Sequence, residues 1–252
     1  MIDIHSHLLP GVDDGSRSAE MSIRVLERFG RDGVEVLVCT PHLLATDAHR
    51  VDDAHYAAVF DDLVRQAPAK PALLRGWEIM LDAPGIDLRA PHLGLGGSSA
   101  ILVEFPRMNV PAGAAHELFR IRGSGRVPVL AHPERYWGCT PARVAEWKRA
   151  GAVIQLDAAM LVAGGSVGKL ARALLDEGLV DCIASDNHGD VRSLAAARRW
   201  LEEAGAPEHA ELLTRANAER LLHDQPTVPV PPLPTTARGM LARFKELLLG
   251  RR

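Results

Sequence analysis

Residues 1–15 read MIDIHSHLLPGVDDG, a short apolar run that leads into two histidines and then two adjacent aspartates. One residue separates His5 from His7. Alternate residues of an extended strand point to the same side, so these two imidazoles could share one ion. The opening of the chain therefore predicts a strand that delivers a pair of metal-ligating side chains at its carboxyl end.

Six further apolar runs follow, and most are continuous rather than alternating, which is typical of parallel strands covered on both faces. The predicted strands are residues 1–4, 34–39, 72–75, 101–103, 127–131, 152–156 and 180–184. Helical periodicity occupies residues 18–31, 54–66, 114–121, 141–149, 167–177, 192–203 and 207–222. Residues 82–99 are rich in Gly and Pro and predict a long loop. This alternation predicts a parallel α/β fold, either a barrel or a doubly wound sheet.

A His, Asp or Glu stands at the carboxyl end of every predicted strand, the edge where parallel α/β folds build their sites. These residue types, with no cysteine among them, suit Mn²⁺, Zn²⁺, Fe²⁺ or Mg²⁺. Carboxylates gathered at one edge would repel one another, and bound cations would balance them. The candidates are His5, His7, Asp13, Asp14, His42, Glu78, Glu104, His132, Asp157, Asp186 and His188. Of these, we expect Asp157 to be structural.

The composition is that of a globular protein, with 47% hydrophobic and 24% charged residues. A net charge of −3 and an aromatic content of 4% do not favour nucleic acid as a partner. The chain shows no signal-peptide pattern and no apolar stretch of membrane-spanning length, and its three cysteines form no CxxC pair. We therefore expect a cytoplasmic, reduced protein.

None of the cysteines is placed like a catalytic nucleophile. Three residues separate Cys139 from Arg143, whereas cysteine-dependent tyrosine phosphatases need five. Cys39 and Cys182 lie inside apolar strand runs and are expected in the core. The chemistry expected of the His, Asp and Glu candidates is hydrolysis by hydroxide generated on metal ions.

Six segments, DIHSHLLPGVDDG, TPH, GWE, EFP, AHPER and SDNH, occur in this order along the chain. Together they resemble the PHP (polymerase and histidinol phosphatase) superfamily, and within it the protein-tyrosine phosphatase branch encoded with bacterial capsule and exopolysaccharide machinery. The resemblance covers residues 1–225. It implies a distorted, TIM-like (β/α)7 barrel with three divalent metal ions, often manganese, although Fe, Zn and Mg are compatible with the same ligands.

The resemblance also implies which residues do what. The ligands implied for the three ions are His5, His7, Glu78 and Asp186; then Glu78, Glu104 and His132; then Asp14, His42 and His188. Asp14 is preferred to its neighbour Asp13, although the sequence alone does not separate them. Arg135 matches a phosphate-binding arginine. Arg192 is a second candidate, and its distance from the SDNH segment is shorter than the family's usual spacing.

The function implied is dephosphorylation of phosphotyrosine in a partner protein, the natural partner being a tyrosine autokinase of polysaccharide export. A small-molecule phosphatase such as histidinol phosphatase would use the same metals. A non-catalytic regulator with this fold would be expected to have lost ligands, and none of the nine positions has lost its ligand. An acidic body without fused domains argues against a nuclease or a polymerase-proofreading module.

The chain changes character after Leu222. Residues 226–234 hold five prolines and predict a stiff, extended linker that stays off the barrel core. The predicted units are thus a catalytic barrel over 1–225, a linker over 226–235 and a basic amphipathic helix over 236–252. The apolar face of that helix would pack on the barrel, form a dimer or lie on an anionic membrane surface. The oligomeric state is left open.

Overall fold

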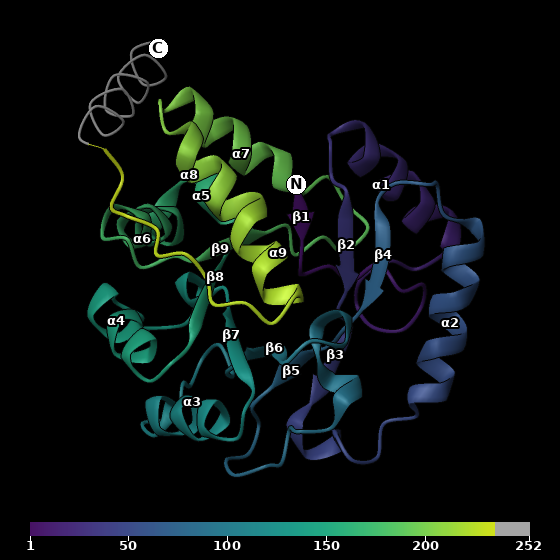
Figure 1. The fold of residues 1–252 in the computed structure, drawn as a ribbon, viewed down its shortest axis with the longest axis horizontal. Helices are drawn as coiled ribbons and strands as arrows, with labels where there is room; N and C mark the ends of the chain where they lie inside the picture. Colours follow the sequence, from purple (N-terminus) through teal and green to yellow (C-terminus); the bar gives the residue numbers. More distant parts are fainter. Residues whose placement is uncertain (235–252) are drawn as a thin grey trace.

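The structure is a computed structural model that describes residues 1–234. Strands and helices alternate along the chain, and every strand pair is parallel (Figure 1). The strands are β1 (Ile2–Asp3), β2 (Val36–Cys39), β3 (His42–Leu44), β4 (Ala72–Arg75), β5 (Glu78–Met80), β6 (Ala100–Glu104), β7 (Val127–Ala131), β8 (Val153–Asp157) and β9 (Cys182–Ala184). The α-helices are α1 (Ala19–Arg31), α2 (Asp53–Gln66), α3 (Ala114–Gly123), α4 (Pro141–Arg149), α5 (Ala158–Val162), α6 (Gly165–Asp176), α7 (Leu194–Glu203), α8 (Pro207–Glu211) and α9 (Asn217–Leu222).

The strands form two sheets, ordered β1-β2-β4 and β3-β5-β6-β7-β8-β9, and the backbone joins them on one side. Pro41 has no N–H to donate and interrupts the path from β2 into β3. Across the interruption, the Gly76 N–H donates to the Cys39 carbonyl (2.9 Å) and the Glu78 N–H to the Pro41 carbonyl (3.0 Å). β2 with β3, and β4 with β5, are therefore two continuous strand paths.

The ring closes between β9 and β1. Ser6 and Asn187 form a parallel bridge just beyond the two strands. The Asp186 N–H donates to the His5 carbonyl (3.0 Å), and the His7 N–H donates to the Asn187 carbonyl (2.8 Å). Seven strand paths thus follow one another around the ring in chain order, which confirms the distorted (β/α)7 barrel.

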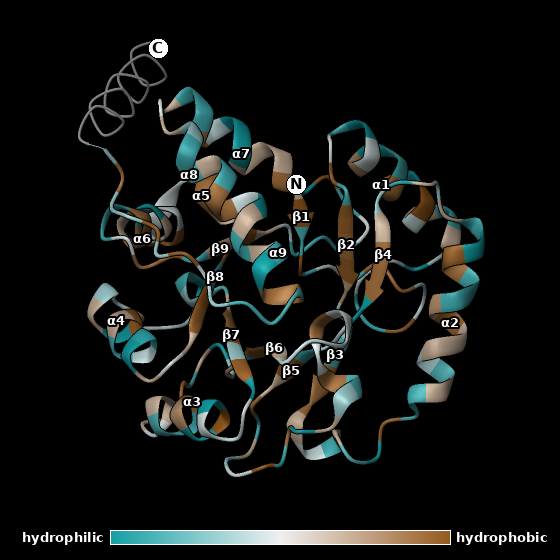
Figure 2. Ribbon diagram, in the orientation of Figure 1, coloured by the Kyte–Doolittle hydropathy of each residue, from teal (hydrophilic) through white to brown (hydrophobic). Residues whose placement is uncertain are grey.

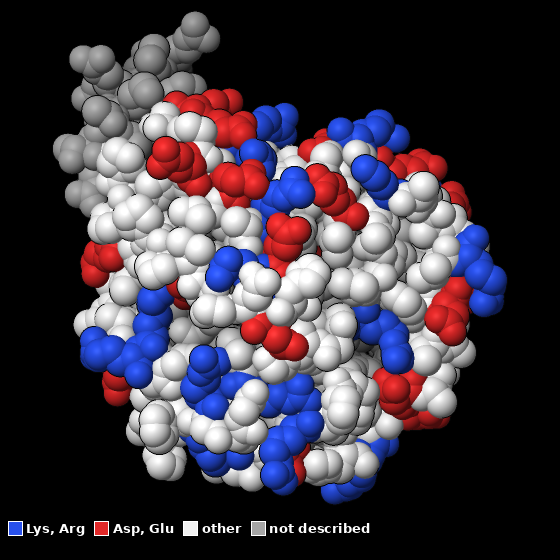
Figure 3. All heavy atoms as spheres, in the orientation of Figure 1, with Lys and Arg blue, Asp and Glu red and all other residues white. Residues whose placement is uncertain are grey.

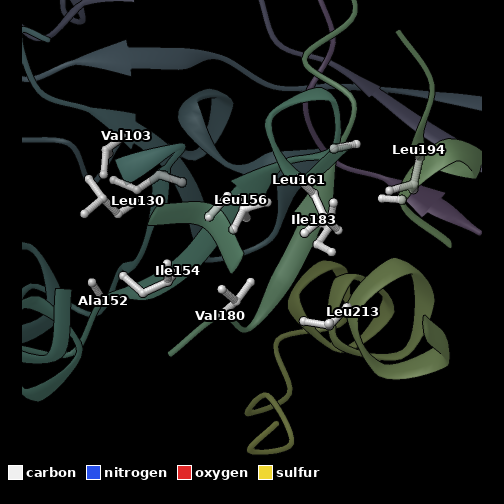
Figure 4. Packing of buried hydrophobic residues seen from close by; sticks show 14 of the residues in the cluster. Val103, Leu130, Ala152, Ile154, Leu156, Leu161, Val180, Ile183, Leu194 and Leu213 are labelled. Carbon is white, nitrogen blue, oxygen red and sulfur yellow. The ribbon is translucent and has the colours of Figure 1, made fainter. Parts of the chain in front are cut away.

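Two apolar layers hold the barrel together. Leu102 and Val129 belong to the cluster on the inner face of the strands, and Leu221 of α9 packs against the same cluster. Successive side chains of a strand point to opposite faces, so Leu130 and Ile154 face outward and pack in the cluster that includes the helices. Figure 4 shows this outer packing, and Figure 2 shows the hydrophobic strands inside helices with hydrophilic outer faces.

All seven predicted strands are present, whereas the three-residue strands β3 and β5 and the short helix α5 were not predicted. The predicted loop over residues 82–99 contains two one-turn 3₁₀ helices. Among the described residues, no helix has the length and apolar character needed to cross a membrane. Acidic and basic side chains are interspersed on the face drawn in Figure 3, with Lys and Arg gathered in its lower half.

The expectation that residues 226–234 stay off the barrel core is wrong. Val230 and Leu233 are 6% and 3% exposed and belong to the main hydrophobic cluster. The segment lies close against Gly178, where a Cβ would come within 2.9 Å of the Val230 carbonyl oxygen. Prolines remove backbone donors but leave the residues between them free to pack and to hydrogen-bond. The tail helix predicted over 236–252 lies outside the described residues.

Asn217 fastens the proline-rich segment to the barrel. Its side chain is fully buried. The amide nitrogen donates to the carbonyls of Asp181 (2.8 Å) and Val228 (2.9 Å), and the amide oxygen accepts from the Val228 N–H (2.7 Å).

We expect Asn217→Ala to lower the free energy of unfolding by about 2–4 kcal/mol, because it leaves the buried Asp181 carbonyl unpaired and removes both side-chain hydrogen bonds to the Val228 backbone. Urea denaturation measures the loss. The exposed amide of Gln225 offers a matched control, and Gln225→Ala should change stability by less than about 0.5 kcal/mol. Equal effects of the two substitutions would show that the proline-rich segment is not held through Asn217.

Candidate metal centre

All nine residues predicted as metal ligands meet where the carboxyl ends of the strands converge. They fall into four overlapping groups, in each of which the ligand atoms lie within 4.8 Å of one another. The groups are His7, Asp14, His42 and His188; His5, Glu78 and His132; His5, His7 and Asp186; and His42, Glu78 and Glu104. Because the groups share members, the nine side chains form one connected cluster.

The carboxylate of Glu78 lies at the centre of this cluster and is 1% exposed. Its Oε2 is 3.3 Å from His5 Nε2, 3.2 Å from His7 Nε2 and 3.0 Å from His42 Nδ1. Its Oε1 is 2.8 Å from His132 Nε2. Four imidazoles from three strand paths therefore converge on one carboxylate.

The spacing of the donors suits a shared cation better than hydrogen bonding alone. The Nε2 atoms of His5 and His7 lie 3.1 Å apart, and each is 3.3 Å from Asp186 Oδ1. Ligands at about 2.1 Å from a tetrahedral or octahedral ion are separated from one another by about 3.0–3.4 Å. Imidazole and carboxylate donors without thiolate suit Mn, Fe, Zn or Mg ions. The residues present thus fit divalent metal ions.

The structure separates the two aspartates that the sequence leaves equivalent. The Asp14 carboxylate is 3.3 Å from His42 Nε2 and 3.5 Å from His188 Nε2, as expected of a ligand. The Asp13 carboxylate instead accepts from His7 Nδ1 at 2.7 Å and from the Gly15 N–H at 2.9 Å. Asp13 therefore orients the His7 ring so that Nε2 faces the cluster.

Gln155 performs the same task for His5, and sequence reasoning missed it. Its Oε1 lies 2.9 Å from His5 Nδ1, and its Nε2 donates to the Leu156 carbonyl at 2.8 Å. The signal was present: Gln155 is a polar residue inside a buried strand, two positions before Asp157 and hence on the same inner face. This face also carries candidate metal ligands.

The carboxylates of the cluster have divergent pKa values. Burial favours the neutral form of Glu78, but His5, His132 and His42 outweigh burial and hold its pKa well below the usual range. Burial and the neighbouring Glu78 carboxylate raise the pKa of Glu104 to about 7. The cluster thus contains one firmly ionised carboxylate beside one that readily takes up a proton.

The two predicted phosphate-binding arginines converge on the Asp186 carboxylate. Arg135 forms an ion pair with Asp186, and its Nη1 lies 3.6 Å from Asp157. Arg192 Nη1 lies 3.4 Å from Asp186, and its Nε donates to Asp190 at 2.8 Å. Asp157 also caps α5 by accepting from the Ala159 N–H (2.7 Å), in line with its expected structural role.

A turn immediately after β7 places Arg135 here. His132 has a positive φ of 36°, an uncommon conformation for a residue other than glycine. The 3₁₀ helix Pro133–Arg135 follows directly. The turn brings the guanidinium to a pocket of about 420 Å³, which most of the candidate metal ligands line together with Arg107 and Met108.

The cysteines are not activated. Burial raises the pKa of Cys39 to about 12 and that of Cys139 to about 11. Burial also raises the pKa of Cys182. A thiol with a raised pKa supplies little thiolate near neutral pH. The expectation that Cys39 and Cys182 lie in the core is confirmed.

We expect Asp13→Asn to weaken Mn²⁺ binding by about 10–100-fold, because the His7 ring loses the carboxylate that fixes its orientation. Isothermal titration with Mn²⁺ measures the affinity. Asp61→Asn, an exposed substitution on α2, is the matched control and should leave binding unchanged. An unaltered affinity in Asp13→Asn would mean that Asp13 only stabilises its own loop.

Comparison with known proteins places the chain in a family. Residues 1–223 match the family described as capsular polysaccharide synthesis, CpsB/CapC. The chain is 30% identical to the tyrosine-protein phosphatase YwqE of Bacillus subtilis, over 97% of this chain and 100% of that protein. It is 28% identical to the tyrosine-protein phosphatase CpsB of Streptococcus agalactiae, over 88% of this chain and 98% of that protein.

The fold agrees with this match. A crystal structure from work on YwqE of Bacillus subtilis and CpsB of Streptococcus pneumoniae, which describes them as metal-dependent tyrosine phosphatases, superposes with a TM-score of 0.76. That match has 27% sequence identity and covers 93% of this chain and all of the other. Sequence and structure together show that the chain belongs to the CpsB/CapC capsular polysaccharide synthesis family.

Proposed function

We propose that this protein is a metal-dependent protein-tyrosine phosphatase. The observation that carries the proposal is the connected cluster of nine His, Asp and Glu side chains beside two arginines, in a chain that belongs to this family. The activated-cysteine mechanism has no support in the structure, since burial raises the pKa of all three thiols.

The proposed centre holds three ions, with manganese the metal we expect and Fe, Zn and Mg compatible with the same donors. The proposed ligand sets are His5, His7, Glu78 and Asp186; Glu78, Glu104 and His132; and Asp14, His42 and His188. When bound, such ions hold phosphate oxygens, lower the pKa of water and stabilise the leaving oxygen.

The protein's own part is to bind and orient the phosphate. The side chains of Arg135 and Arg192 are 19% and 22% exposed, so each is partly accessible while being held by Asp186. A planar guanidinium pairs with two oxygens of a phosphate and balances charge that spreads over them as the ester bond breaks. These two arginines are the proposed catalytic residues besides the metal ligands.

The mouth of the site suits a protein substrate. Met108 and Trp137 are 75% and 73% exposed, and the Trp137 N–H donates to the Arg107 carbonyl (2.8 Å), which ties the loops after β6 and β7 together. Exposed apolar side chains beside a reaction site are typical of a surface that meets another protein. The proposed partner is a tyrosine autokinase of polysaccharide export, in keeping with the family.

Turnover of a phosphotyrosine peptide, compared with histidinol phosphate, tests this function. We expect EDTA to abolish peptide hydrolysis, Mn²⁺ to restore it, and iodoacetamide to leave it intact. Preferential turnover of histidinol phosphate would make the protein a small-molecule phosphatase. Inactivation by iodoacetamide without loss of metal would disprove the metal mechanism.

We expect Arg135→Ala to lower kcat/KM for the phosphotyrosine peptide about 10–150-fold, since one charge-assisted hydrogen bond is lost. Metal content, measured by atomic absorption, should stay unchanged. Arg135→Lys should recover part of the activity, because it keeps the charge but not the planar fork. Arg149→Ala on the exposed side of α4 is the control. Unchanged kinetics in Arg135→Ala would remove this residue from the mechanism.

We also propose a cytoplasmic protein, with the basic tail over 236–252 in contact with anionic lipid near its partner. Co-sedimentation with anionic vesicles should be seen for the full chain and lost in a chain that ends at Pro234. Pro234 is the suitable end point because Val230 and Leu233 pack on the barrel. Basic residues contribute about 1 kcal/mol each, so salt should weaken binding. Equal sedimentation of both chains would exclude the tail as the anchor.

A further inference from the structure

A second pocket, of about 490 Å³, lies beside the metal centre between β3 and the beginning of α2. We refer to it as the β3–α2 pocket. His42 and Met80 line both this pocket and the metal-binding pocket. The two pockets are therefore neighbours that share part of their lining.

The walls of the β3–α2 pocket are largely apolar. Leu44, Val51, Tyr56 and Met80 contribute them, and Leu44 is 42% exposed. The charged groups at this pocket are of both signs, and Asp52 is already engaged as the N-cap of α2. An apolar group that enters the β3–α2 pocket would remove the exposed apolar surface of these walls from water. The mixed charges at the pocket favour neither an anionic nor a cationic ligand.

The pocket is built on fixed elements. The Tyr56 ring packs edge-on against Trp77, with the ring centroids 4.5 Å apart and the planes at 78°, and Trp77 is buried. The backbone N–H of Thr46 donates to Asp82 at 3.1 Å, and its hydroxyl donates to the same carboxylate at 2.6 Å. A preformed pocket binds without the entropic cost of ordering a loop.

We propose that the β3–α2 pocket binds an apolar side chain of the substrate polypeptide, within a few residues of the phosphotyrosine. The inference rests on the proposed phosphatase function and adds to it a determinant of substrate sequence. An extended chain advances about 3.3–3.4 Å per residue, so a nearby side chain reaches an adjacent pocket while the phosphate stays at the metals. The occupant is thus a leucine-like side chain of the substrate.

A peptide series tests this. In this series, each phosphotyrosine peptide carries either Leu or Ser at a single position, and that position is varied over the few residues on both sides of the phosphotyrosine. The compound p-nitrophenyl phosphate serves as a substrate without flanking residues. We expect the wild type to favour Leu over Ser at one position by about tenfold or more in kcat/KM.

The variants Leu44→Asn and Val51→Asn add no charge near the metals. Each should abolish the preference for Leu while changing p-nitrophenyl phosphate hydrolysis by no more than about twofold. Leu44→Met, which stays apolar, should keep the preference. Phe119→Asn, at a position that is 63% exposed on α3, is the matched control and should also keep it.

Three results would overturn the proposal. Equal kcat/KM of the wild type for the Leu and Ser peptides at every position would refute the pocket's role and leave the phosphatase function intact. A loss of p-nitrophenyl phosphate hydrolysis in the variants as strong as their loss of Leu-peptide hydrolysis would assign the pocket to the phosphate or its aromatic ring. Absence of turnover with every phosphotyrosine substrate would refute the proposed function and this inference together.

Discussion

Four imidazoles converge on the carboxylate of Glu78, and this contact constrains the rest of the barrel. A carboxylate that is 1% exposed is costly unless cations or hydrogen-bond donors surround it. His5, His7, His42 and His132 meet that requirement from three strand paths around the ring. Each of these strands must therefore end at the same height, which ties the register of the strands to the chemistry of the site.

The breaks between β2 and β3 and between β4 and β5 serve the same constraint. β3 and β5 pair with His42 directly beside Glu78. The crowding at Gly76 shows how tightly the path is fixed, because a Cβ there would come within 2.8 Å of the Leu95 side chain and 3.0 Å of the Val38 side chain. A larger residue here would have to displace these side chains, so glycine suits the step from β4 into β5 that brings Glu78 to the centre.

The sequence predicts much of this arrangement, because continuous apolar runs and the residues after them report on parallel strands and their carboxyl ends. Strands of three residues, such as β3, leave no periodicity to detect. The preference for Asp14 over Asp13 comes from the family resemblance and not from the sequence alone, since adjacent carboxylates differ only in where the loop directs them. The prediction that residues 226–234 stay off the barrel core failed for a physical reason. A high proline content predicts a stiff backbone, whereas packing on the barrel depends on single apolar residues such as Val230.

The electrostatics of the cluster couple metal binding to proton binding at His5. Burial opposes the charged form of His5, but the carboxylates of Glu78 and Asp186 outweigh it and raise its pKa to about 9. A protein stripped of metal at neutral pH therefore keeps a proton on His5, which partly balances the carboxylates. The proposed metal ion would bind the neutral imidazole, so its uptake would release that proton, and acid would compete with the ion. The carboxylates of Glu78 and Asp186 that attract the cation also stabilise the proton on His5, which competes with it. The affinity for the ion is therefore expected to rise with pH up to about the pKa of His5.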